Sequence, residues 1–317
     1  LAHSLVQRIG AGRYDLHPLV QEFAARKLDG TAEVQISAAH RTYYLPLLAS
    51  TKMPQRTPLR IDFDNIRSAW QSAVLALDGA LVEPSLVPFG EFIAQYGGMA
   101  DGNALLSATI ERFAALPDQQ ELVAQLLNQQ TNFLRALAGL PAIAPLQQQI
   151  LALTQKPALQ ITAHLDLANH YAEQGEWAQA DHHFDQAEAL TQASSDLGAY
   201  ITMVEERIHV NAIHFRGDFA QGIKRLEEML QLFDQATTPI HDAEKIRMYL
   251  LRSLTMLTLR HRDYGLSLRY ARQTLAWVQQ LDLRQRQGDA LLDLALAEQF
   301  AGLYDQAVAH NQSSLAI

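Results

Sequence analysis

The side chains that come closest to a metal-binding or catalytic pattern lie in one short stretch, DHHFDQAE, at residues 181–188. On a helix, His182 and Asp185 would share one face, because neighbours on a helix are three or four residues apart. The acids of a second face are Asp181, Asp185 and Glu188. Imidazole and carboxylate groups bind metal ions, so a metal site and, more weakly, a helical hydrolase are open alternatives. We favour a solvated, charged helix face, since no His-Glu-x-x-His pattern and no cysteine accompany the stretch.

Other enzymatic patterns are absent from the sequence. It has no G-x-S-x-G nucleophile motif and no G-x-x-x-x-G-K-[ST] phosphate loop. Carboxylates adjoin basic side chains, as Glu205 and Glu206 adjoin Arg207, which is typical of helix surfaces. We therefore predict a chain that is not an enzyme, has no metal site and binds no cofactor by itself.

The charge and hydropathy of the chain limit its partners. Its 317 residues are 48% hydrophobic and 19% charged, with a net charge of −9. Residues 1–60 carry +4 (eight basic against four acidic residues), and the remainder carries −13 (seventeen against thirty). This acidity disfavours direct contact with nucleic acid, and the lack of an apolar run near 18 residues disfavours a membrane span. The absence of cysteine and of a leader sequence favours a cytoplasmic location.

A recurring helix–turn–helix pattern organises the elements that must position any site. Breaks recur at positions 98, 139, 175, 217, 262 and 302, which are 36 to 45 residues apart. An aromatic ring follows two residues after each of the last four breaks, and a small residue comes three residues later. The rings are Trp177, Phe219, Tyr264 and Tyr304, and the small residues are Ala180, Gly222, Ser267 and Ala307. A period of this size predicts stacked helix pairs, with a ring buried at each hairpin end and a small residue where helices cross.

The expected fold class is therefore all-α, a right-handed α-solenoid of about six helix pairs. In such an array the first helix of each pair lines the concave surface, and counting back 13, 10, 6 and 3 residues from each break selects the inward side chains. Those suited to binding a ligand are Asn169, Arg207, Asn211, His214, Tyr249 and Arg252. Guanidinium groups suit a carboxylate or phosphate, and amides suit a peptide backbone. In the alternative interpretation, these side chains pair with nearby acids such as Glu205, Glu206 or Asp289 and only solubilise the groove.

The best copy of the pattern resembles a tetratricopeptide repeat. The matching residues are Leu167, Ala168, Tyr171, Gly175, Trp177, Ala180, Phe184 and Ala187. The spacing exceeds the 34 residues of the standard repeat, as is usual in the sensor domains of large bacterial regulators. Arg207 and Asn211 resemble the carboxylate-binding grooves of some members of this family, although Ser253 stands where those grooves have a further Asn.

Two further segments resemble the signal-transducing ATPases, a class that includes plant resistance proteins, apoptotic ATPases and bacterial transcription regulators. The first, RYDLHPLVQEFAARKL at residues 13–28, reads as a short strand, a break at His17-Pro18 and an amphipathic helix. It is similar to the end of the winged-helix domain, where the family has a hydrophobic-His-Asp signature, but Pro18 replaces the Asp. The second segment, with Asp64, Asn65, Ile66, Arg67 and Ala69, resembles the helix that opens the sensor region.

This resemblance implies a domain order and a role for His17. The domains would be a winged-helix remnant at 1–30, a helical linker at 31–80 and tetratricopeptide-like repeats at 81–317. His17 would contact the phosphate of ADP in the intact parent, whose ATP or ADP would be held by an upstream nucleotide-binding domain of the same chain. By its chemistry alone, His17 is an exposed or half-buried corner residue. The parent would extend beyond both ends of this sequence.

The predicted function is recognition. We expect a sensor domain that binds a partner protein, peptide or small-molecule effector on its concave face. Such binding would shift the parent between closed and open states in signal transduction or transcription regulation. The alternative is a non-catalytic scaffold whose outer faces mediate oligomerisation or complex assembly.

Overall fold

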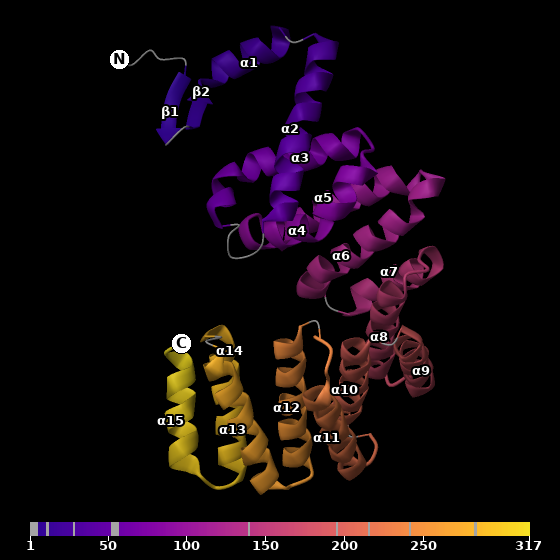
Figure 1. The fold of residues 1–317 in the computed structure, drawn as a ribbon, viewed down its shortest axis with the longest axis vertical. Helices are drawn as coiled ribbons and strands as arrows, with labels where there is room; N and C mark the ends of the chain where they lie inside the picture. The colour runs from indigo at the N-terminus through magenta and orange to yellow at the C-terminus, as the bar shows by residue number, and fades with distance from the viewer. Residues whose placement is uncertain are drawn as a thin grey trace. The chain divides into compact units, whose positions relative to one another are not determined.

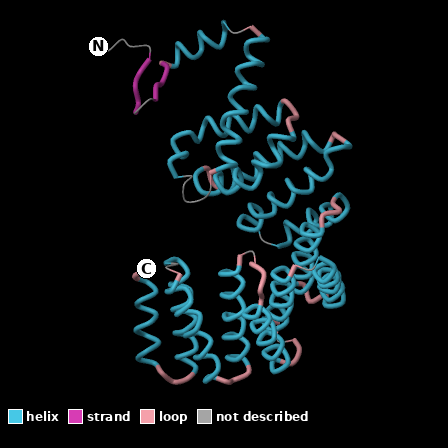
Figure 2. Tube along the Cα trace, in the orientation of Figure 1, coloured by secondary structure: helices cyan, strands magenta, loops and turns pink. Residues whose placement is uncertain are grey.

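The fold is built almost entirely from helices (Figures 1 and 2). The computed structural model describes residues 6–10, 13–27, 29–51, 57–138, 140–194, 196–214, 216–240, 242–281 and 284–317. It forms two compact units, residues 1–137 and 138–317. Within the described ranges, no helix is both long and apolar enough to cross a bilayer. The predicted all-α fold is confirmed, with one β-hairpin as its only strands in the described part of the chain.

The first unit begins with that hairpin and a helix. Strands β1 (Val6–Gly10) and β2 (Arg13–Leu16) pair antiparallel, with Val6 opposite Leu16, and helix α1 (Pro18–Lys27) follows at once. The predicted order of strand, break at His17 and helix is therefore confirmed. Residues 1–5, 11, 12 and 28 lie outside the described residues, and the assignment of 1–30 to a winged-helix domain stays a prediction.

The helices of the first unit share one core. They are α2 (Gly30–Ser50), α3 (Phe63–Leu75), α4 (Gly79–Tyr96), α5 (Met99–Ala114) and α6 (Gln120–Ala138), with short 3-10 helices at Thr57–Asp62 and Pro117–Gln119. The ring of Trp70 stacks on Phe89 at 4.0 Å between centroids, and its indole N–H donates to the Thr109 hydroxyl at 3.1 Å. Leu45 and Leu48 of α2 are fully buried. Residues 31–80 thus contribute to a packed core, whereas the functional boundaries at 30 and 80 stay predictions.

The second unit is a row of helices that lie side by side (Figure 1). They are α7 (Leu140–Leu153), α8 (Pro157–Glu173), α9 (Trp177–Ser194), α10 (Leu197–Ile213), α11 (Phe219–Gln235), α12 (Ala243–Arg260), α13 (Tyr264–Gln280), α14 (Arg284–Phe300) and α15 (Tyr304–Leu315). The last eight form four antiparallel pairs, and the predicted breaks at 175, 217, 262 and 302 lie between the helices of a pair. The break at 98 lies between α4 and α5, and Gly139 lies outside the described residues. Gly175 and Gly217 have φ of 76° and 83°, a left-handed conformation that ends a helix without a Cβ clash.

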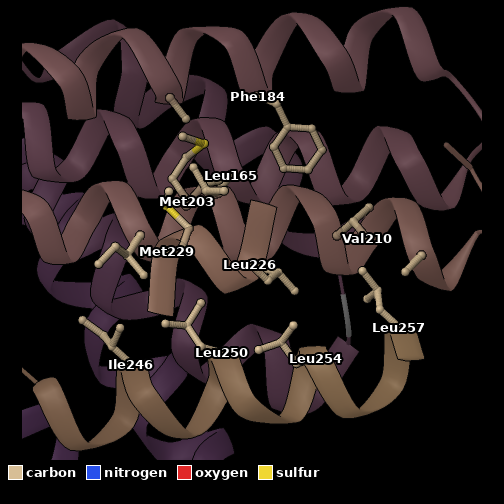
Figure 3. Close-up of a cluster of buried hydrophobic side chains, with 14 of the residues drawn as sticks. Leu165, Phe184, Met203, Val210, Leu226, Met229, Ile246, Leu250, Leu254 and Leu257 are labelled. Carbon is tan, nitrogen blue, oxygen red and sulfur yellow. The ribbon is translucent and has the colours of Figure 1, made fainter. Parts of the chain in front are cut away.

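A continuous apolar core joins the helix pairs of the second unit. Figure 3 shows Phe184 of α9, Met203 of α10, Leu226 of α11 and Leu254 of α12 converging between the helices. The small residues predicted at the helix crossings are buried there, with Ala180 and Ser267 at 0% exposure and Ala307 at 5%. At Gly222 an added Cβ would lie 2.8 Å from Leu257 Cδ2, so a larger residue would require the Leu257 side chain to shift.

The aromatic ring after a break is partly covered wherever a further helix pair is present. Arg216 lies over the Trp177 ring at 4.2 Å, and Tyr264 stacks with Phe300 at 6.4 Å between centroids. Phe219 packs against the main core. The predicted burial was wrong for Tyr304, which is 66% exposed. Its helix, α15, is the last that the structure describes, and no described helix lies against this ring from the far side.

We expect Trp177→Ala to lower the free energy of unfolding by about 3 kcal/mol, because the ring is lost from a packed hairpin end together with its cation–π contact. Tyr304→Ala is the matched control and should change stability by less than about 0.5 kcal/mol, because its ring is already solvated. Urea unfolding followed by circular dichroism measures both. Equal effects at the two positions would contradict the packing described above.

Candidate functional site

A groove of about 640 Å³ lies along α8, α10, α12 and α14, the first helices of the four pairs. We call it the inner groove. Its volume is within the range of roughly 300–1,000 Å³ that is usual for ligand sites. The repeat pattern predicts that the first helices line the concave face. Stacked repeats typically bind their ligands on such a surface.

Apolar side chains form much of the wall of the inner groove. They are Val210 and Ile213 of α10, Met256 and Leu259 of α12, and Leu296 of α14. Ile213 and Leu296 are 42% and 46% exposed. A ligand that covered them would remove apolar surface from water, which favours association by roughly 25 cal/mol per Å².

Acidic groups outnumber basic ones in the inner groove. Its carboxyl groups are those of Glu173, Glu205, Glu206 and Asp293, and its one guanidinium is that of Arg252. Arg252 already has a partner across the helix pairs, because its Nε lies 2.6 Å from Asp293 Oδ2 and its Nη2 lies 3.4 Å from Asp293 Oδ1. This two-point pair connects α12 to α14.

Glu205 is a half-buried acid that lines the groove. The Ser253 hydroxyl donates to its carboxyl group, and Ser253 also lies 3.2 Å from His209 Nδ1. Burial raises the pKa of Glu205 from 4.5 to about 7; the nearby Glu206 also raises it, and Ser253 and Arg252 oppose the shift. Burial, with Arg252 and Arg260, lowers the pKa of His209. At neutral pH the groove thus has an uncharged imidazole beside a half-ionised acid.

The structure brings four of the six predicted ligand-binding residues together. Asn169, His214, Tyr249 and Arg252 line the inner groove. Arg207 and Asn211 instead line a separate pocket of about 520 Å³ between α10 and α11. Arg207 Nη1 lies 2.8 Å from Asp185 and 3.2 Å from Glu188 of α9. The guanidinium is therefore paired with acids of the preceding helix pair.

The displacement of Arg207 and Asn211 has a simple geometric cause. The loop between α10 and α11 has five residues, 214–218, whereas the corresponding loops at 174–176, 261–263 and 301–303 have three. Counting back from Gly217 therefore misplaces the inward face of α10 by two residues. Correcting for the two extra residues selects Glu205 and His209, which do line the groove. The unequal spacing of the breaks was the only sign of this in the sequence.

The acidic and histidine stretch at residues 181–188 has structural partners. Arg207 forms ion pairs with Asp185 and Glu188, and Arg216 Nη2 lies 3.2 Å from Asp181. His183 Nδ1 lies 2.8 Å from His164 Nδ1, and burial together with His183 and His182 lowers the pKa of His164 to about 4. In the described part of the chain, no three His, Asp or Glu side chains gather as metal ligands.

His17 caps a helix. Its exposed imidazole accepts a hydrogen bond from the Leu19 backbone N–H at 3.2 Å, and its carbonyl accepts one from Val20 N–H at 2.8 Å. These contacts satisfy donors at the start of α1. One exposed side chain, without a phosphate loop in the sequence, does not make a nucleotide site within this chain. The contact of His17 with ADP in an intact parent stays a prediction.

The fold is an α-solenoid of stacked helix pairs, with the inner groove along the first helix of each of the last four pairs. The chain is similar to the Signal Transduction ATPase with Numerous Domains (STAND) protein with a tetratricopeptide repeat sensor from Pyrococcus horikoshii. The TM-score is 0.63 at 15% identity, over 98% of this chain and 43% of that one. The predicted resemblance to such a sensor region is thus confirmed at the level of the fold.

Two other solved structures share the architecture. BtubC from P. vanneervenii matches with a TM-score of 0.55 at 15% identity, over 69% of this chain and 90% of that one. The APC/C hetero-tetramer Cut9–Hcn1 matches with a TM-score of 0.54 at 14% identity, over 94% and 56%. No protein-family model and no curated protein matches the sequence. The chain spans 43% of the STAND protein, so the likeness extends to less than half of that molecule.

Glu205→Gln should stabilise the chain more as the pH rises. Between pH 4.5 and about 7 the folded state keeps a proton on Glu205 that the unfolded state releases, so stability falls across this window. The glutamine side chain does not titrate, so the variant does not lose stability across this window. Its side-chain carbonyl can still accept a hydrogen bond from the Ser253 hydroxyl. We expect its advantage to grow to on the order of 3 kcal/mol at pH 8, since the pKa of Glu205 rises from 4.5 to about 7 on folding and each pKa unit is about 1.4 kcal/mol.

Urea unfolding at pH 4, 6 and 8 measures the effect of Glu205→Gln. Glu173→Gln serves as the control, because Glu173 lines the same groove but is exposed. A pH-independent difference between Glu205→Gln and the parent chain would contradict the burial of this acid.

Proposed function

We propose that this chain is the sensor region of a signal-transducing ATPase and binds a peptide segment of a partner protein in the inner groove. A general role in protein interaction or sensing is what a tetratricopeptide-type fold supports. The observation that carries the finer proposal is the exposed apolar wall of the groove, with Ile213 and Leu296 presented by different helix pairs.

The position of the groove explains how binding would act on a larger protein. A ligand there touches α8, α10, α12 and α14, and so connects four consecutive helix pairs. Because each pair contacts mainly its neighbours, small changes of the angle between pairs add up along the array. A ligand that prefers one curvature would stabilise the state of the parent that has it. In this proposal the ATP or ADP belongs to an upstream domain of the same chain, with His17 near its phosphate.

A scaffold function is the second candidate, and the last helix pair favours it. Tyr304 and Val308 of α15 are 66% and 56% exposed, and Phe300 of α14 is 54% exposed. Tyr304 and Val308 lie four residues apart on α15 and therefore share one apolar face of the last helix pair that the structure describes. Association through this face would assemble complexes without any ligand in the groove.

The peptide proposal predicts that Ile213→Glu combined with Leu296→Glu abolishes binding. The purified chain is screened against immobilised, capped hexapeptides of random composition, and the selected peptides are titrated in solution. The double variant should weaken their binding by more than about tenfold and change stability by less than about 0.5 kcal/mol, because both side chains are partly solvated.

The matched control is Arg207→Ala combined with Asn211→Ala. These residues lie in the separate pocket, so the variant should keep peptide binding even where it loses stability. Loss of binding in this control but not in the groove variant would overturn the assignment of the site.

The scaffold alternative has its own test. Tyr304→Glu combined with Val308→Glu would convert an oligomer into a monomer if the apolar face of α15 mediates assembly. The sensor proposal predicts no change of mass for this variant. Light scattering after size-exclusion chromatography measures the mass.

A further inference from the structure

The hollowed face of the first helices continues beyond the inner groove. A pocket of about 400 Å³, bounded by the first halves of α10 and α12, shares Glu206 and Tyr249 with the inner groove, and we call it the middle pocket. A pocket of about 320 Å³, between α8 and the start of α10, shares Asp196, Ala199 and Thr202 with the middle pocket, and we call it the end pocket. Because neighbouring pockets have lining residues in common, the three form one continuous channel.

One face of α10 lines this channel from end to end. Ala199 and Thr202 line the end and middle pockets, and Glu206 lines the middle pocket and the inner groove. Val210 and Ile213 line the inner groove. Steps of three or four residues connect neighbours on one face of a helix, so the channel runs along the axis of α10.

The two ends of the channel are apolar, and its middle is polar. Ile161 and Leu165 of α8 form part of the end pocket, and Ile213 and Leu296 are exposed in the inner groove at the other end. The middle pocket presents hydroxyl, carboxyl and ammonium groups, which include those of Thr202, Tyr249, Asp196, Asp242 and Lys245. An extended peptide leaves its backbone N–H and C=O groups without internal partners and needs polar groups beside it, whereas a helix satisfies its own.

The length of the channel determines the length of the segment that can fill it. Ala199 and Ile213 are 14 residues apart on α10, a distance of about 21 Å at the helical rise of about 1.5 Å per residue. An extended segment advances about 3.3 Å per residue and covers this distance in about six steps. A helical segment would need about fourteen.

We infer that the ligand of this chain is an extended peptide segment with two apolar residues six positions apart, one bound in the inner groove and the other in the end pocket. This rests on the proposed function and names the conformation and the spacing of its ligand. The first apolar residue packs on Ile213 and Leu296, and the second packs on Ile161 and Leu165. The backbone between them crosses the middle pocket and forms hydrogen bonds with its polar groups.

Three capped, fluorescently labelled heptapeptides test the spacing. The first has leucines at positions 1 and 7 with serine and threonine between them; the second has serine at position 7; the third has its second leucine at position 4 instead. Fluorescence anisotropy measures their binding to the purified chain. The first peptide should bind at least about tenfold more tightly than either of the others, because only it can place a leucine at both ends of the channel.

Charges in the end pocket should remove the contribution of the second leucine. Ala158 and Thr162 of α8 line this pocket and are exposed, so Ala158→Glu combined with Thr162→Glu adds two charges there without changing the buried core. This variant should bind the first peptide only as tightly as the second, and its affinity for the second should equal that of the parent chain. Ala178→Glu combined with Gln186→Glu is the matched control, since these exposed residues of α9 line none of the three pockets, and it should keep the full preference.

A fifteen-residue helical peptide with leucines at positions 1 and 15 tests the conformation of the ligand. Its two leucines are separated by the same distance of about 21 Å. It should bind more weakly than the first heptapeptide, because its backbone groups are already paired and gain nothing in the middle pocket. Tighter binding of the helical peptide would show that the ligand is not extended.

The outcomes distinguish this inference from the proposed function. If the three heptapeptides bind equally well and Ile213→Glu with Leu296→Glu still abolishes binding, the groove binds peptides but the second apolar contact is wrong. If the control variant loses the preference as fully as the end-pocket variant, the effect is one of net charge, and the role of the end pocket is wrong. If no peptide binds, or the groove variant changes nothing, both the inference and the proposed function are overturned.

Discussion

The structure depends on one constraint: a single helix pair cannot bury its own apolar face, so each pair must pack against the next. Leu226 of α11 and Leu250 and Leu254 of α12 are fully buried because they lie between neighbouring pairs. The close approach favours small residues at the crossings, as at Gly222, where an added Cβ would meet the Leu257 side chain at 2.8 Å. Wherever a following pair is present, the ring after the break is partly covered as well.

The groove is a consequence of this packing. Stacking of first helices creates a half-apolar surface, and some of the charged groups on it, such as Glu205, are partly removed from bulk water. Burial therefore changes their chemistry, as the raised pKa of Glu205 illustrates. The same surroundings make the pairing of Arg252 with Asp293 an internal connection between α12 and α14 rather than an exposed ion pair.

The two arginines of the predicted site illustrate how position alters the role of a residue. Arg207 and Arg252 have the same chemistry and occupy the same predicted place in consecutive repeats. Arg252 lines the groove, whereas Arg207 bridges to Asp185 and Glu188 on the other side of α10. A loop longer by two residues moves the predicted inward positions of α10 by two residues. This is a rotation of about 200° around the helix axis, because each residue of a helix turns by about 100°. Loop length therefore decided which side chains a ligand could meet.

The sequence by itself determined the helix pairs, their breaks and their crossings. Glycines that end helices and small residues in step with them act through local sterics, which depend on residue type alone. It did not determine the ionic partners of Arg207 and Arg252, the burial of Glu205 or the exposure of Tyr304. Those depend on which helices meet, and the acids involved are 19 to 48 residues away along the chain from their partners. Only the tertiary structure decides such contacts, because charge and solvation respond to distance in space and not to separation in sequence.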